Sequence, residues 1–264
     1  MSEVEYFKKL HEKIGDDFIT LSSLNIMKTS NYEYPGHFVS LWDDFTHNIP
    51  SWENYLFDKF KGKDDLVFLE LGTAQARASV WLLEEVLTGN GCKLLTVDHK
   101  TEQYASIKGN SFLAELYNTI DKQTPNVYPD KIMEFKNRDW WKDRNDFKFP
   151  YNVLRNLKPY QDSERCDFFK GTTSTFFKSL NVKEEVFDFI YIDASHNPED
   201  VILDAVNSFR LLKTGGMMIF DDYGWGNCKV GIDCFLETHR NYLEHHLDKF
   251  TNYQMIVEKT KDLV

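Results

Sequence analysis

Two apolar runs that each end in carboxylates organise the second half of the chain. The first run covers 187–192 and ends at Asp193, and the second covers 217–220 and ends at Asp221 and Asp222. Continuous apolar runs separated by one helix-length crossover are typical of a βαβ unit in a buried parallel sheet. Because open α/β sheets bind ligands outside the carboxyl ends of their strands, we expect these acids at the edge where chemistry takes place.

The segment between these runs has the period of an amphipathic helix. Asn197 can cap its start and Pro198 suits the first helical position, while the turn Lys213-Thr-Gly-Gly216 would end it. The expected buried stripe consists of Val201, Ile202, Ala205, Phe209 and Leu212. His196 precedes this helix, so it should meet the three carboxylates at the same sheet edge.

The first half of the chain contains a second unit of strand, turn and helix. The run 66–71 leads into the small-residue turn Gly72-Thr-Ala-Gln-Ala-Arg77, and a helical stripe follows. Small residues let the backbone approach a ligand and leave the amides of the helix N-terminus free. The next strand, 93–98, ends at Asp98, where a carboxylate usually receives ribose hydroxyls. This half of the pattern fits a NAD enzyme and an S-adenosylmethionine enzyme equally.

The N-terminal residues 1–63 lack clean strand patterns and are rich in aromatic side chains. We expect an accessory helical lid, with a loop at Pro50 and a helix that ends near Lys61-Gly62. Most of these aromatics would only cover the sheet. Candidates for substrate contact are Tyr32, Tyr34 and His37, which lie around a Pro-Gly turn.

Residues 64–264 would then form the ligand-binding domain. Between about 101 and 164 prolines and charged residues interrupt the alternation, which indicates an insertion with its own helices, near 109–120 and 153–157.

The rest of the chain completes the expected sheet. A short strand at 166–170 precedes the polar turn Gly171-Thr-Thr-Ser174, in which Thr173 and Ser174 could also cap a helix. A helix from about Gly231 to Leu247 and a closing strand at 253–258 follow. The predicted fold class is α/β and Rossmann-like, with a mostly parallel seven-stranded sheet and helices on both faces.

Composition narrows the class of protein. With 264 residues and 42% hydrophobic content the chain can bury a large core, and its start lacks the features of a secretory signal. No apolar run approaches the length of a membrane span, so we expect a cytoplasmic protein with no membrane partner. Four cysteines without C-x-x-C spacing suggest buried thiols rather than a zinc ribbon or disulfides.

The net charge of −11 argues against a nucleic-acid partner, because such affinity comes largely from neutralising phosphates with Lys and Arg. One stretch, 136–144, combines basic and aromatic residues, and it could hold single-stranded nucleic acid or a sugar. Its interspersed acids make a solvated flap at least an equal interpretation. A neutral or cationic small ligand fits the charge better.

Several blocks in order resemble class I S-adenosylmethionine-dependent methyltransferases, and most closely the metal-dependent O-methyltransferases of the macrocin and novobiocin sugar type. The blocks are Glu70-Leu-Gly72-Thr73, the strand-end Asp98, Gly171-Thr172-Thr173, Tyr191-Ile-Asp193-Ala-Ser-His196, Leu-Leu-Lys-Thr-Gly-Gly and Phe-Asp221-Asp222-Tyr223. They cover roughly 65–98 and 166–258. The order of the blocks, rather than any single motif, carries the resemblance.

The resemblance implies a role for each matching residue. Glu70, Gly72 and Thr73 would hold the methionine part of S-adenosylmethionine, and Asp98 would hold its ribose. The turn from Gly171 through Thr172 to Thr173 would lie by the adenine.

The resemblance also implies a metal site. Asp193, Asp221 and Asp222 match the carboxylates that hold a divalent ion, Mg²⁺ by preference for hard oxygen ligands. Asp193 could contact the cofactor as well as the metal. Tyr223 and Trp225 beside this site are further candidates for substrate contact.

Two departures from the family pattern matter. Ala76 replaces the second glycine of E-x-G-T-x-x-G, which could shift the cofactor loop. Where many relatives read Asp-Gly-Asp-His, this chain reads Asp193-Ala-Ser-His196, so the resemblance leaves His196 as the catalytic base. An imidazole can accept a proton near neutral pH.

The expected function is therefore Mg²⁺-dependent O-methylation of a hydroxyl on a sugar or similar polyhydroxylated acceptor, either a small molecule or a glycan. A phenolic or catechol-like acceptor is the first alternative. A NAD-linked oxidoreductase and a non-catalytic nucleotide-binding protein are alternatives of other classes. A homodimer also stays open.

Overall fold

The computed structural model describes residues 32–38, 45–98, 148–180, 185–248 and 253–263. Its strands are β1 (Val67–Leu71), β2 (Lys93–Asp98), β3 (Cys166–Lys170), β4 (Phe187–Ile192), β5 (Leu212–Phe220), β6 (Leu243–Leu247) and β7 (Met255–Lys259). Its helices are η1 (Thr46–Asn48), α3 (Ile49–Phe60), α4 (Arg77–Trp81), η2 (Leu82–Val86), α9 (Lys148–Asp162), α10 (Thr173–Ser179), α11 (Pro198–Leu211) and α12 (Gly226–His239).

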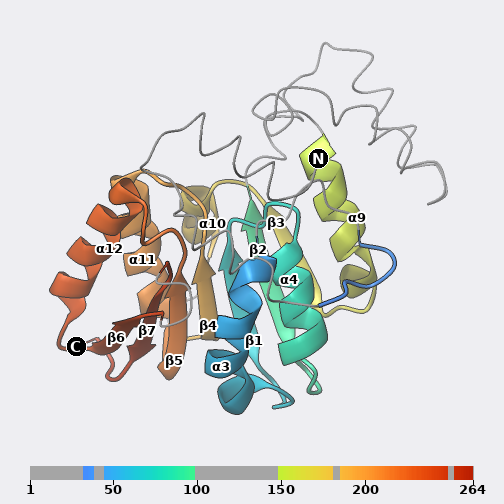
Figure 1. Ribbon diagram of the computed structural model, residues 1–264, viewed down its shortest axis with the longest axis horizontal. Helices are drawn as coiled ribbons and strands as arrows, with labels where there is room; N and C mark the ends of the chain where they lie inside the picture. The colour runs from blue at the N-terminus through green and yellow to red at the C-terminus, as the bar shows by residue number, and fades with distance from the viewer. Residues whose placement is uncertain (1–31, 39–44, 99–147, 181–184, 249–252, 264) are drawn as a thin grey trace, which may run out of the picture.

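The strands form one seven-stranded sheet in the order β3-β2-β1-β4-β5-β7-β6 (Figure 1). β1 to β5 pair in parallel, whereas β7 runs antiparallel to both β5 and β6. The sheet is therefore mixed, with its five-stranded parallel part as predicted. The order reverses at β1 and β4, and ligands of open α/β sheets bind at such a switch point.

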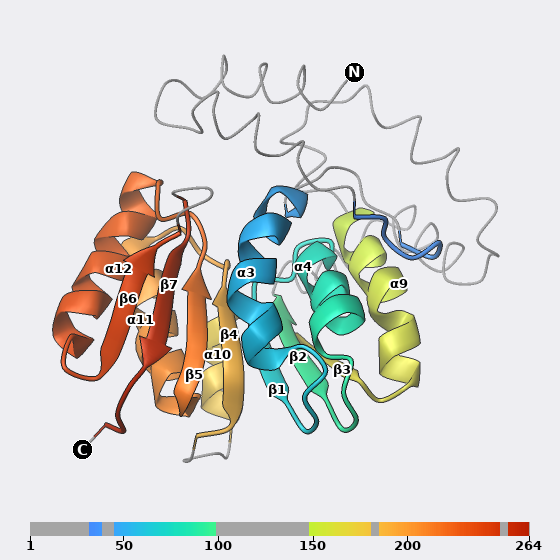
Figure 2. The same cartoon turned by 60° about the horizontal axis from the view of Figure 1, so that its bottom comes forward.

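Helices cover both faces of the sheet, with α3, α4 and α9 on one face and α10, α11 and α12 on the other (Figure 2). Successive residues of the central strands point to opposite faces, so Phe68 packs under the first helix group and Leu69 under the second. Burial on both sides explains why these strands read as continuous apolar runs rather than as alternating ones.

Helix α3 shows that the aromatic N-terminal region contributes directly to the core. Trp52 is fully buried, with edge-on ring contacts to Phe45, Trp81 and Tyr191. The expectation that most of these aromatics cover the sheet is confirmed for such residues, and the predicted helix end near Lys61 is confirmed as well. The loop expected at Pro50 is wrong, because α3 begins at Ile49 and Pro50 occupies its first turn, where a missing amide hydrogen is tolerated. The rest of the expected lid, 1–31 and 39–44, lies outside the described residues.

Two predicted elements need correction. The helix expected from Gly231 to Leu247 is instead α12 followed by β6, and the residues of β6 after Leu243 are exposed at the sheet edge. The turn expected at Lys213–Gly216 belongs to β5, where the register with β4 shifts and Gly215 has a φ of 81°.

The expected insertion is described only in its last part, where α9 extends well beyond the predicted 153–157. The helix predicted at 109–120 and the basic aromatic stretch at 136–144 lie outside the described residues.

Candidate functional site

The predicted site residues line one edge of the sheet in a defined order. Across the order of the strands, the strand ends carry Gly171 after β3, Asp98 at the end of β2, Gly72 after β1, Asp193 after β4 and Asp221 after β5. Backbone hydrogen bonds join neighbouring ends, from the Gly171 amide to Asp98 and from the Gly72 amide to Val97. The structure thus brings both groups of predicted residues to one edge.

Gly72 follows β1 and lies against the backbone of the loop after β4, and only glycine fits there. Its φ is 94°, and a Cβ on this residue would lie 1.8 Å from the backbone oxygen of Asp193. The backbones of the two βα loops therefore approach as closely as they can. This contact joins the predicted cofactor loop to the predicted metal loop.

The loop after Gly72 holds two alanines in the left-handed conformation. Ala74 has a φ of 46° and Ala76 a φ of 65°, values that favour glycine. The amide of Ala74 donates to Asp98 Oδ2 at 3.0 Å. Ala76, which replaces a family glycine, thus adopts a backbone conformation typical of glycine. Asp98 at the end of β2 holds the loop through its hydrogen bond with Ala74.

Glu70 is buried beneath this loop, with 1% of its surface exposed. Its Oε2 accepts hydrogen bonds from Thr96 at 2.7 Å and from Ser79, and the Thr73 hydroxyl contacts that of Thr96. These contacts join β1, β2, α4 and the loop. In this structure Glu70 and Thr73 support the loop from below, and their predicted role toward the cofactor stays a prediction.

The turn after β3 caps helix α10. The Thr172 hydroxyl accepts a hydrogen bond from the Thr175 amide at 3.1 Å, so the cap is Thr172 rather than Thr173 or Ser174. Thr173 instead hydrogen-bonds to Asp204 of α11, a buried carboxyl whose pKa is raised by desolvation to about 6. Gly171 is buried beside Asp98, at the end of the edge opposite to Asp221.

On the other half of the edge, one tyrosine hydroxyl lies between two carboxylates. Tyr191 Oη is 2.8 Å from Asp221 Oδ2 and 3.2 Å from Asp193 Oδ2. Burial, followed by the charges of Asp193 and Asp221, raises the pKa of Tyr191 well above its usual value. The phenol is therefore neutral and donates its proton to the acid cluster.

Asp221 is almost fully buried, and both of its carboxylate oxygens accept hydrogen bonds. Oδ1 accepts from Gln254 Nε2 at 3.1 Å, and Gln254 Oε1 in turn accepts from the Trp52 indole at 2.7 Å. Desolvation, with the neighbouring charge of Asp222, raises the pKa of Asp221 to about 7. The core aromatics of α3 thus reach the acid cluster through one glutamine.

Asp222 pairs with His196. Its Oδ2 lies 2.8 Å from His196 Nε2, and its Oδ1 accepts a hydrogen bond from the Tyr253 hydroxyl. The ring of Trp225 lies against the imidazole, with centroids 4.5 Å apart. Asp222 therefore fixes one edge of the imidazole, and 33% of the histidine side chain is exposed to solvent.

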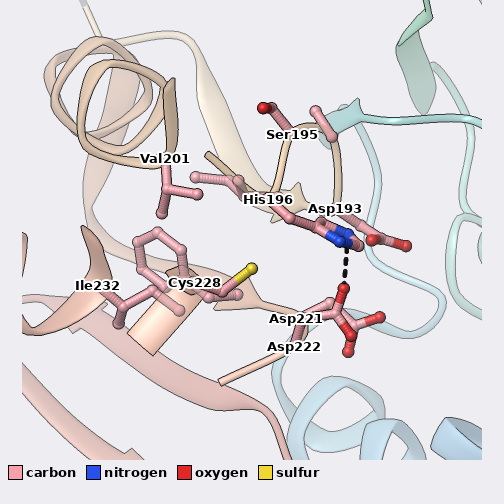
Figure 3. Close-up of a pocket in the computed structure, with 11 residues that line it drawn as sticks. Asp193, Ser195, His196, Val201, Asp221, Asp222, Cys228 and Ile232 are labelled. Carbon is pink, nitrogen blue, oxygen red and sulfur yellow. Dashed lines mark ion pairs between the residues drawn. The ribbon is translucent and has the colours of Figure 1, made fainter. Parts of the chain in front are cut away.

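A pocket of about 240 Å³, counting the solvent at its mouth, lies over the ends of β4 and β5 (Figure 3). His196 and Asp222 point toward each other across it, and Cys228 of α12 directs its sulfur toward the same point. Asp193 and Asp221 also line it. Ser195 turns away and binds Asp200, so it supports the start of α11, whereas Asn197 makes no side-chain cap.

The other predicted substrate contacts lie elsewhere. The Tyr34 hydroxyl donates to the Arg77 carbonyl, and His37 contacts the carbonyl of Asn156 on α9. Tyr32 packs edge-on against Tyr34. Figures 1 and 2 place this segment beside α9, on the side of the molecule away from α12. These three residues do not line the pocket, and their substrate role stays a prediction.

Tyr223 does not line the pocket either, and its hydroxyl donates to Asp233 and accepts from Lys229 of α12. Trp225 is the predicted substrate contact that lies beside His196.

Sequence reasoning missed four residues of this site: Tyr191, Tyr253, Gln254 and Cys228. Tyr191 lies on β4 two residues before Asp193, which follows the strand directly, and a period of two along extended chain places both side chains on one face. No comparable signal marks the others, because they reach the site from a later strand and helix.

The fold and this strand-end site define an α/β protein of the Rossmann-like methyltransferase class. A profile described as "Methyltransferase domain" matches residues 69–223, which is more than half of the chain. The chain belongs to this methyltransferase family. The NAD-linked alternative is therefore set aside. Among curated proteins, none matches the sequence significantly.

Comparison with solved structures finds similar proteins at low sequence identity. A structure described as a putative rRNA-methylase from Clostridium thermocellum has 13% identity and a TM-score of 0.52, with 82% of this chain and 97% of that chain covered. An O-methyltransferase from Bacillus cereus in complex with SAH has 14% identity and a TM-score of 0.49, with 95% and 96% covered. The O-methyltransferase TomG from Streptomyces achromogenes, in complex with SAM, has 12% identity and a TM-score of 0.49, with 99% and 100% covered. At 13% identity the likeness to the first of these structures concerns the fold alone.

None of the helices in the described ranges has the length and apolar character needed to cross a bilayer.

Proposed function

We propose that this methyltransferase uses S-adenosylmethionine and transfers the methyl group to a hydroxyl of a sugar or similar polyhydroxylated acceptor. The observation that carries this proposal is the order of the strand ends, from Gly171 and Asp98 through Gly72 to Asp193 and Asp221. Adenine, ribose and methionine would follow this order. The transferable methyl group would then point toward the pocket over β4 and β5.

His196 is the proposed proton acceptor. If Nε2 carries the proton and donates it to Asp222, the neutral imidazole has its lone pair on Nδ1. No hydrogen bond from the described part of the chain engages Nδ1, and the side chain is partly exposed. The Trp225 ring limits rotation of the imidazole, so the acceptor atom is held in one direction.

The proposed step is a displacement at carbon. The acceptor oxygen forms a bond to the methyl carbon, the bond from that carbon to sulfur breaks, and the hydroxyl proton passes to His196 Nδ1. The positive sulfonium becomes a neutral thioether. An acid-rich edge favours the cationic cofactor, and fixing both reactants in line can supply up to about 7–11 kcal/mol in model systems.

A divalent ion held by Asp193, Asp221 and Asp222 is part of this proposal. Asp193, Asp221 and Asp222 all line the pocket, and hard oxygens suit Mg²⁺. Among the described residues their carboxylate oxygens do not form a group within 4.8 Å of one another, so the three side chains would have to draw together around the ion. Burial and the charge of Asp222 raise the pKa of Asp221, which is the electrostatic cost that a cation would offset. A bound Mg²⁺ would lower the pKa of an acceptor hydroxyl and fix its oxygen.

The test separates cofactor, metal and acceptor. Calorimetry should detect binding of S-adenosylmethionine to the full chain, and an absence of binding would reject the proposal. EDTA should abolish turnover, Mg²⁺ should restore it, and Asp222→Ala should prevent that rescue. Unchanged turnover with EDTA and in Asp222→Ala would remove the metal role. Sugars and catechols screened side by side would decide the acceptor class.

A further inference from the structure

The pocket brings together a second set of metal-ligand atoms that differs from the three carboxylates. His196, Asp222 and Cys228 each offer one atom, and these atoms lie within 4.8 Å of one another. They come from three segments, the loop after β4, the loop after β5 and helix α12. We propose that they form a binding site for a borderline-soft divalent ion of the Zn²⁺ class.

The arrangement suits such an ion in size. Zn²⁺ binds nitrogen and oxygen at about 2.0–2.2 Å and sulfur at about 2.3 Å, so tetrahedral donors lie about 3.5 Å apart. His196 Nε2 and Asp222 Oδ2 are 2.8 Å apart and would separate slightly around an ion, while Cys228 would move closer. The three side chains converge from different directions in Figure 3.

The donor types select against Mg²⁺ at this point. Thiolate and imidazole favour Zn²⁺ and related ions, whereas Mg²⁺ requires oxygen ligands in octahedral geometry. Three protein ligands also leave a fourth position open toward the pocket, which is the pattern of an accessible zinc site. The ion would share Asp222 with the proposed Mg²⁺ site, so binding of one ion would exclude the other.

Cys228 is placed to complete the ligand set. It is 3% exposed, and its sulfur is one of the three ligand atoms that lie within 4.8 Å of one another. Zn²⁺ takes cysteine as the thiolate, so an incoming ion would displace the thiol proton into solvent. Around the ion, one thiolate and one carboxylate would balance the charge of Zn²⁺.

Occupancy would change the role of His196. A ligand nitrogen has no lone pair left for a proton, and the other ring nitrogen of a neutral imidazole then carries hydrogen. Zn²⁺ bound at Nε2 would thus remove the proton acceptor proposed at Nδ1. We expect Zn²⁺ to inhibit methyl transfer, and this expectation rests on the proposed role of His196 as the base. The metal site itself depends only on the positions of the three ligands.

The experiment uses Co²⁺ as a spectroscopic probe on the full chain after treatment with EDTA and dialysis. The wild type should develop a near-ultraviolet band of thiolate-to-cobalt charge transfer, and Zn²⁺ should displace it while Mg²⁺ should not. Cys228→Ser should lose the band and bind Zn²⁺ at least about 10-fold more weakly. Cys234→Ser is the matched control, because Cys234 is an exposed thiol on the same helix, and it should keep the band.

Two results would overturn the proposal: a wild type without the thiolate band, or a Cys228→Ser protein that retains it. If Cys228→Ser does not fold, His196→Ala serves instead and should weaken Zn²⁺ binding in a protein of unchanged melting temperature. Calorimetry with S-adenosylhomocysteine runs in parallel. Failure of that ligand to bind would count against the proposed function, while the cobalt spectrum alone decides the metal site.

Discussion

The ends of β1, β2 and β3 differ from the ends of β4 and β5 in how polar groups are held. On the first side backbone amides take part at the strand ends: the Ala74 amide donates to the Asp98 carboxylate, and the Gly171 amide donates to the Asp98 carbonyl at the end of β2, above the buried side-chain contacts of Glu70. On the second side the contacts use buried side chains, as where the Tyr191 hydroxyl lies between Asp193 and Asp221. The first arrangement fixes a loop, and the second accumulates negative charge.

This difference matches two separate tasks. Backbone amides and left-handed residues shape a loop that can follow the outline of a ligand, which suits recognition of a constant ligand. A buried cluster of carboxylates stabilises a bound cation or a proton donor, which suits catalysis. Changes on the first side should therefore alter binding, and changes on the second side should alter turnover.

The largest effect is expected from a substitution at Gly72, where the two sides are in contact. Gly72→Ala should cost about 3 kcal/mol or more, because a Cβ at a positive φ is strained and would meet the backbone of Asp193. Calorimetry should find no cofactor binding, and thermal unfolding should show the loss of stability. Gly215→Ala is the control, with a φ of 81° but nothing within 4 Å of the added Cβ, and it should cost only about 1 kcal/mol.

The next effect concerns turnover. His196→Ala should lower kcat by about 10²–10⁴-fold with the affinity for S-adenosylhomocysteine unchanged, because the proton acceptor is lost and the cofactor contacts are not. Steady-state kinetics and calorimetry measure the two quantities. His245→Ala, at an exposed position of β6, should change neither. A His196→Ala enzyme of normal rate would refute the assigned base.

Asp98→Ala should show the reverse pattern. Removal of the carboxylate deletes the acceptor of the Ala74 amide and the proposed ribose contact, which weakens cofactor binding by about 10- to 100-fold. At saturating cofactor, kcat should stay within about 3-fold, as expected for lost uniform binding. Asp167→Ala, an exposed acid on β3, is the matched control. Equal losses in both variants would mean that only surface charge matters.

The smallest effect concerns Asp204, which connects α11 to Thr173 on the first side. Because desolvation raises its pKa from 3.8 to about 6, the folded state holds the proton more tightly than the unfolded chain. This contribution to stability is present below about pH 4 and is lost as the pH rises through 6. Between these pH values the free energy of unfolding of the wild type should fall by about 1–2 kcal/mol relative to that of Asp204→Asn. Urea unfolding of both proteins at pH 4.5 and pH 7 measures this, and identical pH dependence would contradict it.

Much of the fold follows from local patterns in the sequence. The strand-end acids Asp98, Asp193, Asp221 and Asp222 were predicted at one edge, because apolar runs locate buried strands and parallel strands end together. The sequence pattern singled out Ala76 as a replaced glycine that could shift the cofactor loop, and in the structure Ala76 keeps a left-handed backbone with a φ of 65°. These features depend on residues close to one another in the chain.

What the sequence did not indicate depends on distant residues. Strand β6 was taken as helix because its Glu244, His245 and His246 face solvent at the sheet edge and leave no apolar alternation. Tyr253 and Gln254 bind acids some thirty positions earlier, and Cys228 meets His196 only when α12 packs beside α11. A single sequence contains no local pattern that predicts contacts between residues so far apart in the chain.

The late position of Tyr253 and Gln254 has a consequence for the order in which the molecule matures. During synthesis the acids after β5 leave the ribosome before the residues that donate hydrogen bonds to them. Until β7 pairs with β5, Asp221 lacks the hydrogen bond from the Gln254 side chain, and burial of its charge is costly. The hydrogen bonds from Tyr253 to Asp222 and from Gln254 to Asp221 can therefore form only after all five parallel strands have been synthesised.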